Sequence, residues 1–100
     1  MIQAVTYEIQ YEETADGGGT FFVETDGQRV ALIRWEAIPE GMDVVTTKAE
    51  PSMRGTGVAK QLVAKVVEHA RANNLSVRGS CSYAKKVIGE NPDTADLLID

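Results

Sequence analysis

Two glycines near the middle of the chain, Gly55 and Gly57, separate two halves with different hydrophobic periodicities. In the first half, apolar residues recur at roughly alternate positions within short segments bounded by turn residues, which is typical of β-strands. After Gly57 they recur at the spacing of an amphipathic helix. This change of period predicts an α+β fold, with an antiparallel meander followed by helices, in one domain spanning residues 1–100.

The two halves divide further into individual elements. Four strands are predicted for the first half, over residues 2–11, 20–25, 28–38 and 42–49. They are separated by the glycine run at 16–19, the hairpin dipeptide Asp26-Gly27 and the turn at 39–41. The second half is predicted to hold a helix from Gly57 to about Asn73, a short strand over 75–80, a helix over 83–90 and a short terminal helix capped by Asn91. Because a helix connects the fourth strand to the fifth, these two strands are expected to be parallel neighbours.

The composition argues against several classes of function. A formal net charge of -5 leaves no basic excess for a phosphate backbone, so no nucleic-acid partner is expected. No apolar run approaches the length of a membrane span, and the N-terminal segment alternates rather than forming a signal-peptide core, so we expect a cytoplasmic protein without a membrane partner. Cys81 is the single cysteine, which fits a reducing compartment. With His69 as the single histidine, which we interpret as structural, no metal site is expected.

The segment Arg54-Gly55-Thr56-Gly57-Val58-Ala59 stands where the predicted fourth strand gives way to the helix. The first N–H groups of a helix have no internal partner, and the helix dipole places partial positive charge there, so small residues at this point allow an anion to approach the backbone. The spacing does not fit a Walker A loop, and Lys60 stands where a dinucleotide fingerprint needs its third small residue. Two interpretations remain open, an anion-binding loop and a plain tight turn into a helix.

The same segment matches the pattern Arg/Gln-x-x-Gly-x-Gly/Ala in full and resembles the acetyl-CoA pyrophosphate loop of the GNAT superfamily of N-acyltransferases. The similarity runs from about Val45 to Leu98, with a looser match in the meander. The stretch "RGTGVAKQLVAKVVEHARANNLSV", followed by "CSYAKKVIGENPDTADLL", looks like the small single-domain branch, which carries Cys-Ser-Tyr after its fifth strand. The resemblance implies a minimal GNAT-like fold and an acetyl-CoA-dependent N-acetyltransferase, with acetyl-CoA as co-substrate and no metal.

The resemblance also implies where the coenzyme binds. The backbone N–H groups from Arg54 to Ala59 would hold the pyrophosphate. The edge of the fourth strand, at about Thr46 to Ala49, would pair with pantetheine, and the thioester would lie near Cys81 and Tyr83. The candidate coenzyme-binding residues are therefore Thr46, Thr47, Lys48, Ala49, Arg54, Gly55, Thr56, Gly57, Val58, Ala59 and Lys60.

Cys81 and Tyr83 are the candidate catalytic residues. Cys81 precedes the second helix, whose dipole can lower a thiol pKa, so it could accept the acetyl group, line the site without bonding to it, or simply pack at a strand end. Tyr83 could protonate the leaving thiolate, because a phenol pKa of about 10 roughly matches that of a thiol. The alternative for Tyr83 is packing of the second helix on the sheet.

Two departures from the family bear on the acceptor. The small branch usually has a His-Thr-Glu-Val-Pro-like segment before the loop, but this chain has Thr46-Thr47-Lys48-Ala49-Glu50, which removes both the usual histidine and the usual glutamate. The larger enzymes insert helices between their first two strands, whereas only a glycine-rich turn stands there in this chain. An open acceptor side suits an amine of a peptide or protein. The alternative function is a CoA- or acyl-CoA-binding module with little or no turnover.

Overall fold

The computed structural model describes residues 7–99 of the chain. Its elements, in chain order, are β1 (Gln10–Glu13), β2 (Gly19–Thr25), β3 (Gln28–Ile38), β4 (Gly41–Ala49), the 3-10 turn η1 (Pro51–Met53), α1 (Val58–Ala72), β5 (Ser76–Gly79), α2 (Ser82–Glu90) and the 3-10 turn η2 (Ala95–Leu97). No helix among residues 7–99 is long and apolar enough to cross a membrane.

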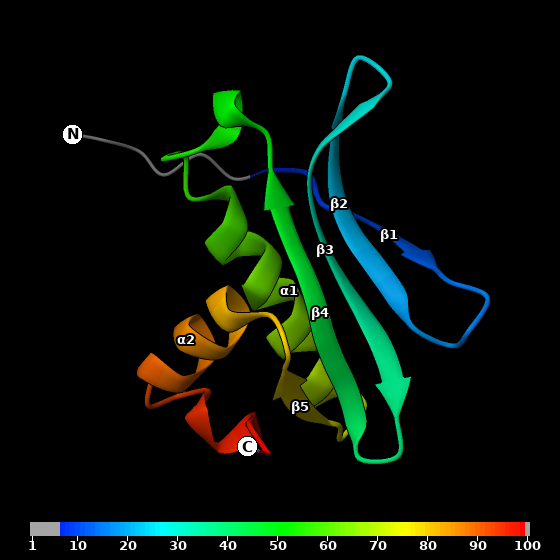
Figure 1. Ribbon diagram of the computed structural model, residues 1–100, viewed down its shortest axis with the longest axis vertical. Helices are drawn as coiled ribbons and strands as arrows, with labels where there is room; N and C mark the ends of the chain where they lie inside the picture. The colour runs from blue at the N-terminus through cyan, green and yellow to red at the C-terminus, as the bar shows by residue number, and fades with distance from the viewer. Residues whose placement is uncertain (1–6, 100) are drawn as a thin grey trace.

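The strands form one sheet in the order β1-β2-β3-β4-β5 (Figure 1). The first four strands pair antiparallel in sequence, and β5 pairs parallel to β4 after the α1 crossover. Helix α1 packs on β2, β3 and β4, and α2 packs on β4, β5 and α1. The α+β class, the meander and the parallel fifth strand are therefore confirmed.

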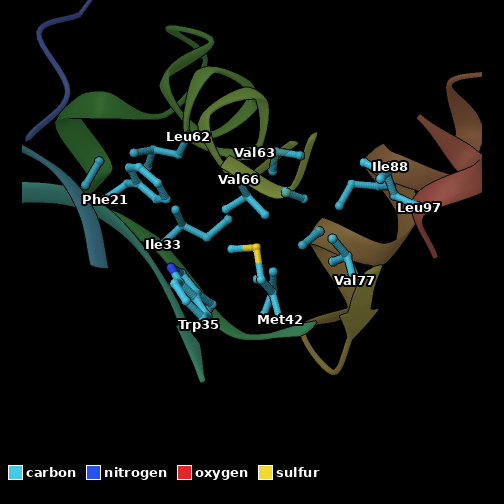
Figure 2. Close-up of a cluster of buried hydrophobic side chains, with 14 of the residues drawn as sticks. Phe21, Ile33, Trp35, Met42, Leu62, Val63, Val66, Val77, Ile88 and Leu97 are labelled. Atoms are coloured by element: carbon cyan, nitrogen blue, oxygen red, sulfur yellow. The ribbon is translucent and has the colours of Figure 1, made fainter. Parts of the chain in front are cut away.

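The core lies between the sheet and the two helices. Figure 2 shows side chains of β3, β4 and α1 pointing toward one another, with Met42 among them. Alternation along β3 supplies Ala31, Ile33 and Trp35 to this layer, while α1 supplies a stripe at helical spacing. The fully buried members with the largest side chains are Ile33, Met42, Leu62, Ile88, Val44, Val58, Val66 and Val77.

The first strand is shorter than the prediction of 2–11, and residues 2–6 of that prediction lie outside the described part. Strand β1 begins only at Gln10. Ahead of it, Tyr7 donates its backbone N–H to Oε1 of Gln61 on α1, at 3.0 Å, and Tyr7 and Ile9 pack against the core. The alternating apolar residues of this segment therefore mark contact with the helix layer rather than a longer β-ladder.

The predicted terminal helix is wrong in extent, because only the 3-10 turn η2 forms. Asn91 does cap a turn, since its Oδ1 accepts the N–H of Asp93 at 2.9 Å. The chain then extends, so that Leu98 bridges Val77 in parallel and Ile99 donates its N–H to the Val77 carbonyl at 3.0 Å. This pairing along the free edge of β5 competes with further helical turns.

Candidate functional site

The loop between β4 and α1 is shaped by two left-handed glycines. Gly55 has φ +78° and Gly57 has φ +85°, a region that costs other residues roughly 1–2 kcal/mol. A Cβ built on either glycine would meet nothing within 4 Å. Backbone conformation, rather than crowding inside the protein, is therefore what requires glycine here, and the space beside the loop is open.

The first turn of α1 presents unpaired amides to this open space. Gln61 donates its N–H to the Gly57 carbonyl at 3.2 Å, and Val58 donates to Oγ1 of Thr56 at a long 3.4 Å. The N–H groups of Ala59 and Lys60 have no hydrogen-bond acceptor within residues 7–99. The first turn carries no acidic residue. The helix end is thus electropositive and has donors to offer an anion.

Strand β4 leaves one of its edges open next to this helix end. Its pairing with β5 stops at Val44 opposite Gly79, while its pairing with β3 continues to Ala49. Glu50 donates its N–H to the Val30 carbonyl on the β3 side, at 2.8 Å. Because hydrogen-bonding direction alternates along an antiparallel strand, Thr47 and Ala49 direct their backbone groups to the opposite, open edge.

Two adjoining cavities, of about 450 Å³ and about 570 Å³, lie between the helix end and this open strand edge. Both are lined by Ala49, Arg54, Ala59 and Tyr83. Together their lining residues are Thr47, Lys48, Ala49, Met53, Arg54, Gly55, Gly57, Val58, Ala59, Lys60 and Tyr83. One continuous hollow therefore runs from the amides of α1, past the β4 edge, to the start of α2.

Two candidate coenzyme residues lie outside this lining, and one lining residue was not predicted. Thr46 sits opposite Arg34 in the β3 ladder, and Thr56 donates its hydroxyl to the Met53 carbonyl at 2.5 Å. Met53 packs on the core and lines the hollow. Its signal in the sequence was one large apolar residue in an otherwise polar turn, which does not by itself indicate a ligand.

The charge of the hollow suits an anionic ligand. Its lining contains the exposed cations Lys48, Arg54 and Lys60, and no histidine, aspartate or glutamate stands among its described residues. Within residues 7–99 no three side chains of the metal-binding types gather at one point. The single histidine, His69, packs against the rings of Tyr11 and Trp35 with centroids at 5.7 Å and 5.3 Å, in line with the expected structural role.

Cys81 lies beside the hollow rather than in its lining. Its backbone N–H donates to the Val44 carbonyl at 2.8 Å, and its Sγ contacts Oγ1 of Thr47 at 3.3 Å. Burial raises the thiol pKa, but the Thr47 hydroxyl and the N–H groups of Ala84, Tyr83 and Thr47 outweigh it, so the pKa of Cys81 falls below its ordinary value. The neutral thiol accepts no hydrogen bond from the first turn of α2. The N–H groups near Cys81 therefore stabilise the ionised form of the side chain, the thiolate.

Tyr83 stands in the first turn of α2 and borders both cavities. Its side chain is 37% exposed. Burial, and then the nearby charge of ionised Cys81, raise the pKa of Tyr83 above its ordinary value. The phenol is therefore neutral at physiological pH and holds a proton that it can donate to an anion in the hollow.

Comparison with known proteins identifies the family to which the chain belongs. The model for the GCN5-related N-acetyl-transferase family matches residues 20–97, and the chain belongs to that family. No curated protein matches. Among solved structures, the IAA acetyltransferase from Bacillus cereus is similar, with a TM-score of 0.53 and 21% identity over 60% of this chain and 41% of that chain. This likeness shows a shared fold, and the match spans less than half the length of that enzyme.

Proposed function

We propose that this member of the GCN5-related N-acetyl-transferase family transfers an acetyl group from acetyl-CoA to an amine of a peptide or protein. The observation that carries the proposal is the single hollow that joins unpaired helix amides, an open strand edge and a neutral tyrosine. The single cysteine is the basis for proposing the cytoplasm as the site of this activity.

The hollow offers a binding group for each part of the coenzyme. The diphosphate would accept hydrogen bonds from the amides of Ala59 and Lys60, with Arg54 and the Lys60 ammonium supplying charge. The amide groups of pantetheine would pair with the outward-facing backbone of Thr47 and Ala49, as an added strand pairs with a sheet edge. With the coenzyme bound in this way, the thioester would lie near Tyr83 and Cys81.

The chemistry needs a polarised carbonyl and an acid for the leaving group. When the acceptor nitrogen attacks the thioester carbonyl, a C–N bond forms, the C–S bond breaks and CoA leaves as a thiolate. Tyr83 donates its proton to that sulfur, and the proton lost by the acceptor amine restores the phenol. The Thr47 N–H, which lies beside Cys81, would serve the developing oxyanion, and pantetheine would then pair with the Thr47 carbonyl and with Ala49.

Cys81 opens a second route for the acetyl group. Its thiolate would attack the thioester, form a new C–S bond and release CoA, after which the amine would take the acetyl group from the protein. The lowered pKa of Cys81 favours this route, whereas its place behind Thr47 favours direct transfer within a ternary complex.

The proposed function predicts steady release of free CoA when acetyl-CoA is incubated with a panel of peptide amines. Replacing Tyr83 by phenylalanine is expected to lower kcat by about 10²-fold, the scale of general acid catalysis. Tyr11→Phe is the matched control, because Tyr11 is similarly exposed, at 38%, and does not line the hollow. A thiol-detection assay measures the release. Equal rates for both variants would remove Tyr83 from the mechanism.

Cys81→Ala separates the two routes for the acetyl group. Because four neighbouring groups stabilise the thiolate, the covalent route predicts one acetyl group on Cys81 after incubation with acetyl-CoA alone, seen by mass spectrometry. It also predicts that Cys81→Ala stops transfer. An unmodified sulfur together with full activity of Cys81→Ala would instead establish direct transfer.

A coenzyme-binding module without turnover is the second candidate function. It is favoured by the absence of any histidine or carboxylate from the described lining, which leaves no side-chain base for an ammonium acceptor. This candidate predicts calorimetric binding of CoA with no release of CoA from acetyl-CoA for any amine in the panel. No binding at all would leave the loop as a plain turn.

A further inference from the structure

The end of β5 departs from a regular ladder at Ser80. Ser76 donates its N–H to the Glu40 carbonyl at 3.3 Å, and a regular parallel ladder would continue with every second residue of β5, so that Ser80 would donate to Val44. Instead Cys81 donates to the Val44 carbonyl at 2.8 Å. The chain has therefore slipped by one residue, and Cys81 occupies the last rung.

The carboxylate of Asp43 binds Ser80, the residue that the slip displaces from the ladder. Its Oδ1 accepts the backbone N–H of Ser80 at 3.3 Å, and its Oδ2 accepts the Ser80 hydroxyl at 2.9 Å. Asp43 immediately precedes Val44, so it stands at the level where the slip occurs. Without this carboxylate, the exposed Ser80 N–H would be left to water, and the regular rung on the Val44 carbonyl would compete for it.

The slip decides where the Cys81 side chain lies. With its own N–H on Val44, Cys81 is held against β4, and its Sγ reaches Oγ1 of Thr47. A regular ladder would give that rung to Ser80 and carry Cys81 one residue further from β4. Cys81 is also the N-cap residue of α2, since Lys85 donates its N–H to the Cys81 carbonyl at 3.0 Å. The position of Tyr83 therefore depends on the same rung.

We propose that Asp43 is a positioning residue of the acyl-transfer site, which holds Ser80 out of the ladder so that Cys81 takes the last rung of β4 and meets Thr47. The role of Asp43 in acyl transfer rests on the proposed function, whereas its effect on the position of Cys81 does not. Asp43 acts through Ser80 and Cys81 and has no contact with the hollow.

The test measures Cys81 directly, without coenzyme or acceptor. The full chain is treated with iodoacetamide from about pH 6 to about pH 10, a range that spans the ordinary thiol pKa of about 8.5. Cys81 is the single cysteine, so the rate reports on this sulfur alone. We expect Asp43→Ala to raise the midpoint of the rate profile, and each unit of that rise lowers the rate at neutral pH by roughly threefold to tenfold.

Conservative and control variants separate positioning from stability. Asp43→Asn keeps an acceptor oxygen for the Ser80 N–H and is expected to restore most of the wild-type midpoint. Glu36→Ala removes the carboxylate directly opposite Asp43 on β3, which pairs with Arg34 instead of Ser80, and should leave the midpoint unchanged. The remaining titratable neighbours are Arg78 opposite Asp43 on β5, and Tyr83 and Lys85 in α2 beside Cys81.

Thermal unfolding of each variant ensures that the profile is that of folded protein. If Asp43→Ala does not fold, Ser80→Ala removes one hydrogen bond from the other side, and the proposal requires a smaller rise of the midpoint in the same direction. A wild-type midpoint in folded Asp43→Ala, or an equal rise in Glu36→Ala, overturns the proposal. Failure of the proposed function would appear separately, as wild-type protein that releases no CoA.

Discussion

Replacing Ala59 by glutamate is expected to abolish coenzyme A binding while the protein stays folded. Ala59 carries an unpaired amide in the first turn of α1 and lines both cavities. A carboxylate there would occupy the anion position itself, interact favourably with the helix dipole and repel a diphosphate. We expect the dissociation constant, measured by calorimetry, to rise at least about a hundredfold, or roughly 2.7 kcal/mol.

Two controls separate charge from size and from general effects on the helix. Ala59→Gln adds nearly the same volume without charge, so it should weaken binding less than Ala59→Glu. Ala72→Glu places the same carboxylate at the far end of α1, away from the hollow, and should leave binding unchanged. Wild-type affinity in Ala59→Glu would show that the coenzyme does not use the amides of this helix.

Replacing Gly79 by alanine is expected to cost about 1–3 kcal/mol of unfolding free energy and to disable the site together with the fold around it. A Cβ at position 79 would lie 2.5 Å from Cβ and 2.8 Å from Cα of Lys85. Neither atom is the end of a flexible side chain, so α2 itself would have to move. Because α2 carries Tyr83 and has Cys81 as its N-cap residue, the shift would displace both candidate catalytic residues.

Gly89→Ala is the matched control for this prediction. Its Cβ would approach only the tip of Leu98, at 3.2 Å, and alanine favours a helix over glycine by roughly 0.5–1 kcal/mol. Chemical denaturation of the three proteins gives the unfolding free energies, and the CoA-release assay gives activity. A Gly79→Ala protein as stable and active as Gly89→Ala would mean that α2 does not rest on this strand.

Much of the fold follows from local pattern, and its errors have local causes. The period change at Gly57 predicted α1 within a residue or two, and the turn dipeptides bounded β2, β3 and β4 closely. The segment from Tyr7 to Ile9 was predicted as strand because helix contact and strand pairing can both produce an alternating pattern. The extent of the last helix depended on a bridge between Leu98 and Val77, which lie far apart in sequence.

The geometry of the candidate site was predictable where it is local to one segment. The spacing of Gly55 and Gly57 before a helix indicates exposed amides from the sequence alone. Which residues of β4 face the open edge was not predictable from the sequence. The register shift between β3 and β4 next to Val44 determines whether Thr46 or Thr47 faces that edge. The hydrogen bond between Asp43 and Ser80 joins residues 37 positions apart, and no sequence motif predicts it.

The donors that the candidate site offers to an anion belong to the main chain. Truncating side chains one at a time to alanine would leave the amides of Ala59 and Lys60 in place, so such a scan would understate the importance of the helix end. Chemical replacement of those peptide N–H groups by ester oxygens would reveal it. For the same reason, most side chains of this turn could be exchanged without removing the donors proposed for the diphosphate.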